Sequence, residues 1–162
     1  MELKWIEEAK SHLGTKEIPG AKSNPKIINW AKSIGGWISS FFKNDDIPWC
    51  GLFVGYVMKS SGYEVTISNP LGAREWLNYG KKTNPRYGAI MVFSRSGGGH
   101  VGFYVSEDDT TYHILGGNQS NMVNVARIDK SRFVGARWPN EDDTTTKAIR
   151  KKFDGKISTN EA

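Results

Sequence analysis

Apolar residues in the first half of the chain recur at the spacing of α-helices. Residues 3–13 carry them every three or four positions, which predicts an amphipathic helix, and residues 25–35 predict a second one. The segment 39–46 is expected to be a loop anchored by its two phenylalanines. Residues 48–58 are apolar on every side, as in a helix buried in a core, and a short helix is expected over residues 73–79.

In the second half the pattern changes to short apolar or alternating runs that are typical of β-strands. Such runs cover residues 88–93, 100–105, 111–115, 122–128 and 133–138. Helices followed by antiparallel strands indicate an α+β fold, with N-terminal helices packed on an antiparallel sheet of about five to six strands. The chain turns polar after Pro139, which predicts one domain over residues 1–140 and a partly basic tail over 141–162 that is disordered or helical.

Composition and charge narrow the class of protein only slightly. The 162 residues contain no apolar stretch of the about 18 residues that a membrane helix needs. Acidic residues lie where a signal peptide would have its apolar core, so we expect synthesis in the cytoplasm without a signal peptide. The net charge of +5 suits polyanionic partners such as cell-wall polymers, and the basic part of the tail is expected to contact anionic envelope surfaces weakly. Because the basic residues are scattered and no nucleic-acid-binding motif is present, we expect no nucleic-acid partner.

Cys50 is the one cysteine of the sequence, which excludes an internal disulfide framework and a multi-cysteine zinc site. It follows Pro48 by two residues and therefore falls in the first turn of the helix expected over residues 48–58. The N-terminus of a helix lowers the pKa of a thiol, and its unpaired N–H groups can stabilise an oxyanion. Cys50 is thus a candidate nucleophile, although a single cysteine is often a small buried hydrophobic residue.

His100 is the candidate base for this thiol. It opens a strand directly after three glycines, which leave space beside the imidazole. A histidine in that position can act as the base and later as the acid of a thiol mechanism. A third group should hold the ring in one tautomer, and two residues compete for that role: His113 on the next strand, and Asn118 in a Gly-Gly-Asn-Gln segment. Each also has a structural interpretation, as an exposed strand position and as a turn residue respectively.

Four segments, in this order along the chain, resemble a known family. They are Pro-Trp-Cys-Gly-Leu-Phe-Val (48–54), Ala-Arg-Glu-Trp-Leu (73–77), Gly-Gly-His-Val-Gly-Phe-Tyr-Val (98–105) and Leu-Gly-Gly-Asn-Gln-Ser (115–120). The sequence is similar to CHAP/NlpC-type cysteine peptidases, in particular to the small single-domain phage endolysins, and the likeness spans residues 3–139.

The resemblance implies a papain-like α+β fold and a hydrolase that cuts an amide bond of bacterial peptidoglycan. Cys50 matches the nucleophile and His100 the base. The Gly-Gly-Asn-Gln context favours Asn118 over His113 as the third catalytic residue. No metal or other cofactor is implied, and we expect a monomer that acts on the cell wall or in the periplasm.

The role and the exact bond remain open at this point. The leading hypothesis is a phage lysin that lyses the host cell. The alternatives are an antibacterial amidase effector secreted into rival bacteria, and an inactive wall-binding module. The choice of the amide that is cut depends on the groove that binds the substrate. Four residues are candidates to line it: Trp49, Asp46, Gln119 and Trp76. The two tryptophans are equally compatible with a position in the core.

Overall fold

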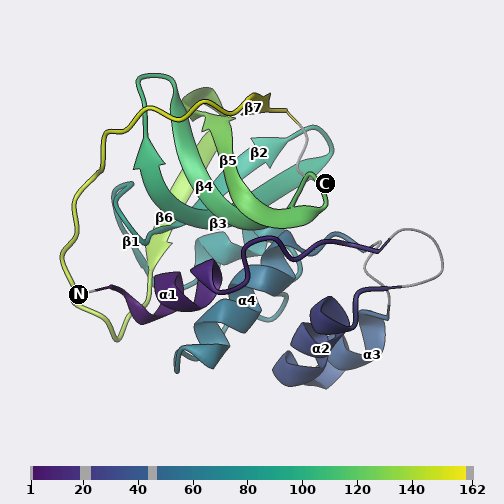
Figure 1. Cartoon of the computed structure of the whole chain (residues 1–162). Helices are drawn as coiled ribbons and strands as arrows, with labels where there is room; N and C mark the ends of the chain where they lie inside the picture. The colour runs from purple at the N-terminus through teal and green to yellow at the C-terminus, as the bar shows by residue number, and fades with distance from the viewer. Residues whose placement is uncertain (1, 19–22, 44–46, 160–162) are drawn as a thin grey trace.

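The computed structural model describes residues 2–18, 23–43 and 47–159, and its helices gather on one side of a curved sheet (Figure 1). The α-helices are α1 (Lys4–Lys10), α2 (Pro25–Ile34), α3 (Gly36–Phe41) and α4 (Cys50–Ser60). Two short 3₁₀ helices are η1 (Ala73–Asn78) and η2 (Lys130–Arg132). Within the described ranges, none of the helices combines the length and the apolar character needed to cross a membrane.

The strands of the described residues form a single sheet with the order β1-β6-β2-β3-β4-β5-β7. The strands are β1 (Lys81–Lys82), β2 (Ile90–Arg95), β3 (Gly98–Glu107), β4 (Thr111–Gln119), β5 (Met122–Asp129), β6 (Phe133–Trp138) and β7 (Ile157–Ser158). Neighbours pair antiparallel except β5 and β7, which are parallel. The α+β fold is therefore confirmed. The expected strands correspond to β2 to β6, and two short strands are added at the edges.

Helix α4 forms the centre of the core, as its uniformly apolar sequence predicted. Eight of its 11 residues are buried. The ring of Phe53 lies between Trp30 of α2 and Phe103 of β3, at centroid distances of 5.4 and 6.4 Å. The helix thus joins the helical layer to the sheet and presents its first residue, Cys50, at the boundary between them.

Local residues explain where α2 begins and ends. The side chain of Asn24 accepts a hydrogen bond from the N–H of Lys26 at 2.9 Å, and Pro25 occupies the first helical position. Gly35 has a φ of 77° and ends the helix. The chain then forms α3 where a loop was expected. Of the two phenylalanines there, Phe42 is buried as an anchor while Phe41 is exposed.

The chain after Thr144 is extended and runs along the sheet on the side away from the helices (Figure 1). We call residues 146–158 the C-terminal strap. Its backbone exchanges hydrogen bonds with Glu107, which donates to the carbonyl of Ile149 and accepts from the N–H of Lys151, both at 2.8 Å. Further on, β7 pairs with β5. The described part of the tail is therefore neither helical nor detached, because it satisfies its backbone groups on the sheet.

Candidate active site

Cys50 is the first residue of α4. The N-cap residue, Trp49, makes no side-chain hydrogen bond to this helix end. The next residue, Gly51, has to be a glycine, because a Cβ there would lie 2.1 Å from the carbonyl oxygen of Pro70. Cys50 is only 6% exposed. The thiol therefore lies at a helix N-terminus and is almost completely buried.

His100 lies on β3, opposite Phe93 of β2, and is fully buried. Its imidazole interacts with the Cys50 thiol, and this interaction is a main cause of the shift in the pKa of the thiol. Burial raises the pKa of Cys50. The hydrogen bond and charge interaction with His100, together with backbone N–H groups of Val101 and Gly51, lower it more, so the net pKa is below the ordinary value. These groups stabilise the thiolate, which is the nucleophilic form.

Gln119, at the end of β4, holds the other side of the imidazole. Its Oε1 lies 2.9 Å from Nε2 of His100. Its Nε2 donates to the carbonyl of Ile114 at 3.0 Å and to the carbonyl and side-chain oxygens of Asn124 at 2.8 and 2.9 Å. Because the amide nitrogen faces oxygens only, the amide oxygen must face His100. Asn124 in turn donates to the backbone carbonyl of Gln119 at 3.0 Å.

This arrangement determines the tautomer of His100. Since Gln119 presents an acceptor, Nε2 of His100 carries the proton and donates it. Nδ1 is then the ring nitrogen that can accept the proton of the Cys50 thiol. The three side chains form the order thiol, imidazole, amide, which is the arrangement of an activated nucleophile with an oriented base.

The third position is thus occupied by Gln119, and the prediction of Asn118 is corrected. A regular strand would place residue 118 on the same face as Gly116, which borders the imidazole. The register of β4 against β5 instead shifts between Gly116 and Gln119, and Asn118 has a φ of 58°. Because of this bulge, Gln119 takes the place of residue 118 on the face that Gly116 occupies. A Cβ on Gly116 would therefore meet Oε1 of Gln119. The side-chain oxygen of Asn118 is buried and has no hydrogen-bond partner among the described residues.

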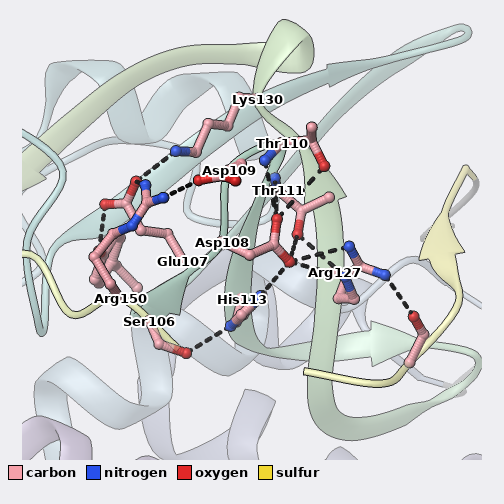
Figure 2. Close-up of polar contacts among 12 residues, drawn as sticks. Ser106, Glu107, Asp108, Asp109, Thr110, Thr111, His113, Arg127, Lys130 and Arg150 are labelled. Carbon is pink, nitrogen blue, oxygen red and sulfur yellow. Dashed lines mark hydrogen bonds and ion pairs between the residues drawn. The ribbon is translucent and has the colours of Figure 1, made fainter. Parts of the chain in front are cut away.

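His113, the alternative third residue, lies in a different part of the sheet. It pairs with Ser106, six residues along β3 from His100, which corresponds to about 20 Å. Figure 2 shows its ring between Ser106 and Asp108, with Nδ1 2.6 Å from the hydroxyl and Nε2 2.9 Å from the carboxylate. The ring is fully buried and packs against Phe153 of the C-terminal strap. This serine, histidine and aspartate therefore form a network in which the serine and the histidine are buried.

Two of the residues predicted to contact substrate are core residues. Trp49 is fully buried, packs beside Trp30 and donates its Nε1 proton to Glu17 at 2.7 Å. Trp76 is also fully buried and donates to the carbonyl of Pro70 at 2.9 Å. Both side chains are therefore part of the core and are not available as walls of a groove.

The other two predicted contacts have different outcomes. Gln119 is 1% exposed and binds His100, so its place is behind the imidazole and not in a groove. Asp46 lies outside the described residues. The positioning residue that the sequence interpretation missed altogether is Asn124, which holds the Gln119 amide.

A cysteine at the start of a buried helix, facing a histidine on an antiparallel sheet, defines a papain-like α+β domain. Residues 42–118, just under half of the chain, match the family model of the CHAP domain, which supports a CHAP-type domain in this part of the chain. No curated protein matches the chain. CHAP domains are typically hydrolases that act on peptidoglycan, and the match supports this class of activity.

Proposed function

We propose that this protein hydrolyses an amide bond of bacterial peptidoglycan with Cys50 as the nucleophile. The observation that carries the proposal is the series Cys50, His100 and Gln119: the thiol lies at the N-terminus of a buried helix, His100 lowers its pKa, and Gln119 is hydrogen-bonded to His100. Such a series activates a thiol for attack on a carbonyl carbon. The CHAP-type domain supplies the substrate class, which the three side chains alone do not specify.

The geometry suggests a two-step reaction. Nδ1 of His100 takes the thiol proton, and the sulfur of Cys50 attacks the carbonyl carbon of the amide. Backbone N–H groups at the start of α4 are suited to stabilise the oxyanion. The imidazolium then gives its proton to the leaving nitrogen as the C–N bond breaks, which releases an amine and leaves a thioester on Cys50.

In the second step water replaces the amine. Nδ1 of His100 removes a proton from water as its oxygen attacks the thioester carbon. The C–S bond breaks, the sulfur recovers the proton, and the new carboxylic acid leaves. Gln119 keeps the ring in the tautomer that both steps need, because its Oε1 accepts a hydrogen bond from the Nε2–H group throughout the reaction.

Replacing the nucleophile tests the proposal. Cys50→Ala and Cys50→Ser are expected to abolish the loss of turbidity of purified cell walls, while circular dichroism and the melting temperature remain near those of the wild type. If Cys50→Ala cleared walls at the wild-type rate, the proposal would be wrong. Mass spectrometry of the released fragments identifies the bond: new peptide amines mean a cut within the peptide, and free stem peptide means a cut at the sugar–peptide amide.

The biological role we propose is that of a phage-type lysin that reaches the wall from the cytoplasm and lyses the cell. An amidase effector directed at rival bacteria would use the same chemistry. The neighbouring genes distinguish the two roles, since a holin gene accompanies a lysin and an immunity gene accompanies an effector. An inactive wall-binding module would carry a thiol that iodoacetamide does not modify near neutral pH.

A further inference from the structure

Trp37 is the tryptophan that the core leaves exposed. The other five tryptophans of the chain are at most 2% exposed, whereas Trp37 is 48% exposed. It belongs to α3, which lies beside α2 at the edge of the helical layer (Figure 1). Its Nε1 donates to the carbonyl oxygen of Ser68 at 3.2 Å, and its ring makes an edge-to-face contact with Phe41 at a centroid distance of 5.7 Å. These two contacts hold a large exposed aromatic ring in place.

Trp37 lines a surface cavity of about 620 Å³, a volume typical of sites that hold drug-sized ligands. The walls of the cavity come from the junction of α2 and α3 and from residues 62–68, in the loop that follows α4. Three residues of this loop that line the cavity, Glu64, Thr66 and Ser68, are exposed. The cavity is therefore open to solvent and accessible to a ligand.

The lining of the cavity also contacts the helix that begins at Cys50. Ile34 and Pro70 both line the cavity, and a Cβ on Gly55 of α4 would lie 3.3 Å from Cδ1 of Ile34 and 3.5 Å from Cβ of Pro70. One turn earlier in α4, the carbonyl oxygen of Pro70 lies against Gly51. Because Gly51 directly follows Cys50, the Cα atoms of Cys50 and Pro70 are no more than about 10 Å apart. Part of the cavity lining is thus a near neighbour of the nucleophile.

The lining combines apolar and polar groups without a net charge. Its charged members, Lys59 and Glu64, are of opposite sign. The hydroxyls of Thr66 and Ser68 form no hydrogen bond within the described residues, and the backbone N–H and C=O groups of residues 64–67 have no partner there either. An exposed aromatic ring beside available donors and acceptors suits an uncharged ligand that has an apolar face and a polar edge.

From these observations we propose that the cavity beside Trp37 binds a sugar ring of the peptidoglycan glycan strand. The inference rests on the proposed function and adds the part of the substrate that carries the peptide. A pyranose ring has a face of C–H groups that packs on the electron-rich face of an aromatic ring, and its hydroxyl and acetamido groups form hydrogen bonds at the edge. The N-acetylated sugars of the glycan are uncharged where a stem peptide is attached, which matches the lining, whereas stem peptides carry free carboxylates.

Acrylamide quenching of tryptophan fluorescence tests the site, because Trp37 is exposed and the other five tryptophans are buried. The protein is Cys50→Ala, and the probes are a peptide-free glycan fragment of two disaccharide units and the stem peptide alone. The glycan fragment is expected to protect Trp37 from the quencher, and the stem peptide is expected to leave the quenching unchanged. Adding Trp37→Ala is expected to weaken binding of the glycan fragment, measured by calorimetry, by about tenfold.

Two further variants in the Cys50→Ala protein separate sugar binding from a structural role of Trp37. Trp37→Phe keeps an aromatic ring and should retain part of the affinity for the glycan fragment. Ile149→Ala removes an exposed apolar side chain from the C-terminal strap, on the other side of the sheet, and should retain all of it. If Trp37 only stabilises α3, Trp37→Ala will melt at a lower temperature and bind the fragment with unchanged affinity, and the inference is overturned.

Other occupants of the cavity give different results. The inference is overturned if the glycan fragment leaves the quenching unchanged or if the stem peptide protects Trp37 equally well. A dimer in sedimentation that Trp37→Ala dissociates would assign the surface to a second copy of the chain and also overturns it. Cleavage of purified walls by the wild type tests the proposed function separately. Cleavage without protection of Trp37 overturns this inference alone, and protection without cleavage overturns the proposed function alone.

Discussion

The Cys50 thiol is subject to two opposing effects on its pKa. Burial disfavours the charged thiolate and raises the pKa, whereas His100 and the backbone N–H groups of Gly51 and Val101 lower it. The lowering effects win, so the thiolate forms at a lower pH than in a free cysteine. The balance depends on one neighbour, His100, because it contributes both a hydrogen bond and a charge.

Removing His100 should therefore reverse the direction of the shift. We expect the alkylation of wild-type Cys50 by iodoacetamide to have its midpoint below about pH 8.5, the value of a free thiol. In His100→Ala burial remains while the largest lowering contribution is lost, so the midpoint should rise above that value. Rates measured by mass spectrometry across the pH range check this, and identical midpoints in the two proteins would contradict it.

In the proposed mechanism Gln119 is a positioning residue, because its side chain contacts His100 and acts on the reaction only through that ring. Gln119→Leu keeps the size of the side chain and leaves the Nε2 proton of His100 without its acceptor. We expect kcat to fall by about 100-fold, the lower end of what a correctly placed acid–base group contributes. The pH profile of kcat should also move, since the ring is no longer held in one tautomer.

Asn118→Gly is the matched control for this variant. Asn118 adopts a positive φ that glycine accepts without strain, and its side chain makes no hydrogen bond within the described residues. The control should retain most of the activity and the wild-type pH profile. A larger loss in Asn118→Gly than in Gln119→Leu would restore Asn118 as the third catalytic residue.

At the scale of the element, the bulge near the end of β4 decides which side chain reaches the imidazole. The hairpin turn that follows has Ser120 and Asn121 at φ values of 54° and 61°, as in a two-residue type I′ turn. Between the bulge and this turn, Gln119 is paired with Met122. The change of register therefore places the Gln119 side-chain amide next to His100, and the flanking turn fixes that register.

A single methyl group at Gly116 should disturb this element without unfolding it. A Cβ there would lie 2.7 Å from Oε1 of Gln119 and 3.5 Å from Nε2 of His100. We expect Gly116→Ala to reduce kcat by at least about tenfold. The free energy of unfolding should fall by only about 1–2 kcal/mol, which lowers the melting temperature by a few degrees. The control is Gly135→Ala, where the Cβ meets only the end of the Leu77 side chain at 2.8 Å. Equal activities of the two variants would argue against the role of the bulge.

At the scale of the whole molecule, the C-terminal strap and the polar network of Figure 2 hold the far end of the sheet. Asp108 accepts hydrogen bonds from Thr111 and Arg127 in addition to its contact with His113. Arg127 also donates to the carbonyl of Gly155 in the strap at 3.0 Å. Burial raises the pKa of Asp108, but the contacts with His113 and Thr111 outweigh it and hold the pKa below the ordinary value.

The stability of the fold should depend on the charge of Asp108 at low pH. A carboxylate whose pKa is lowered by folding contributes stability above its unfolded pKa, about 3.9, and the contribution is lost as the pH falls towards the folded pKa. The melting temperature should therefore decline below about pH 4. Asp108→Asn should be less stable near neutral pH and show a shallower decline. Asp143→Asn, at an exposed site, is the control, and parallel curves for wild type and Asp108→Asn would contradict the prediction.

Local patterns predicted the parts of this molecule that depend on local sequence. The apolar run around Cys50 and the alternation after His100 specify a buried helix and a strand, so the two side chains of the proposed thiol mechanism could be located from the sequence. The place of Gln119 was not predicted, because a bulge shifts the register by one residue without changing composition. The burial of Trp49 depends on Glu17 and other distant partners.

The strap was missed for a related reason. A polar and charged segment has the composition of a disordered tail. Here its backbone finds partners in Glu107 and in β5, which lie far upstream in the chain. Only the three-dimensional arrangement shows that these strands offer unpaired groups to it.

The two outermost strands, β1 and β7, are each two residues long. A sheet edge with a long row of unpaired N–H and C=O groups can add a strand from another molecule, which leads to aggregation. Here β7 covers part of β5, and β1 covers part of β6. Truncation within the strap would uncover β5, and we expect such a protein to lose colloidal stability at high concentration even where its active site remains folded.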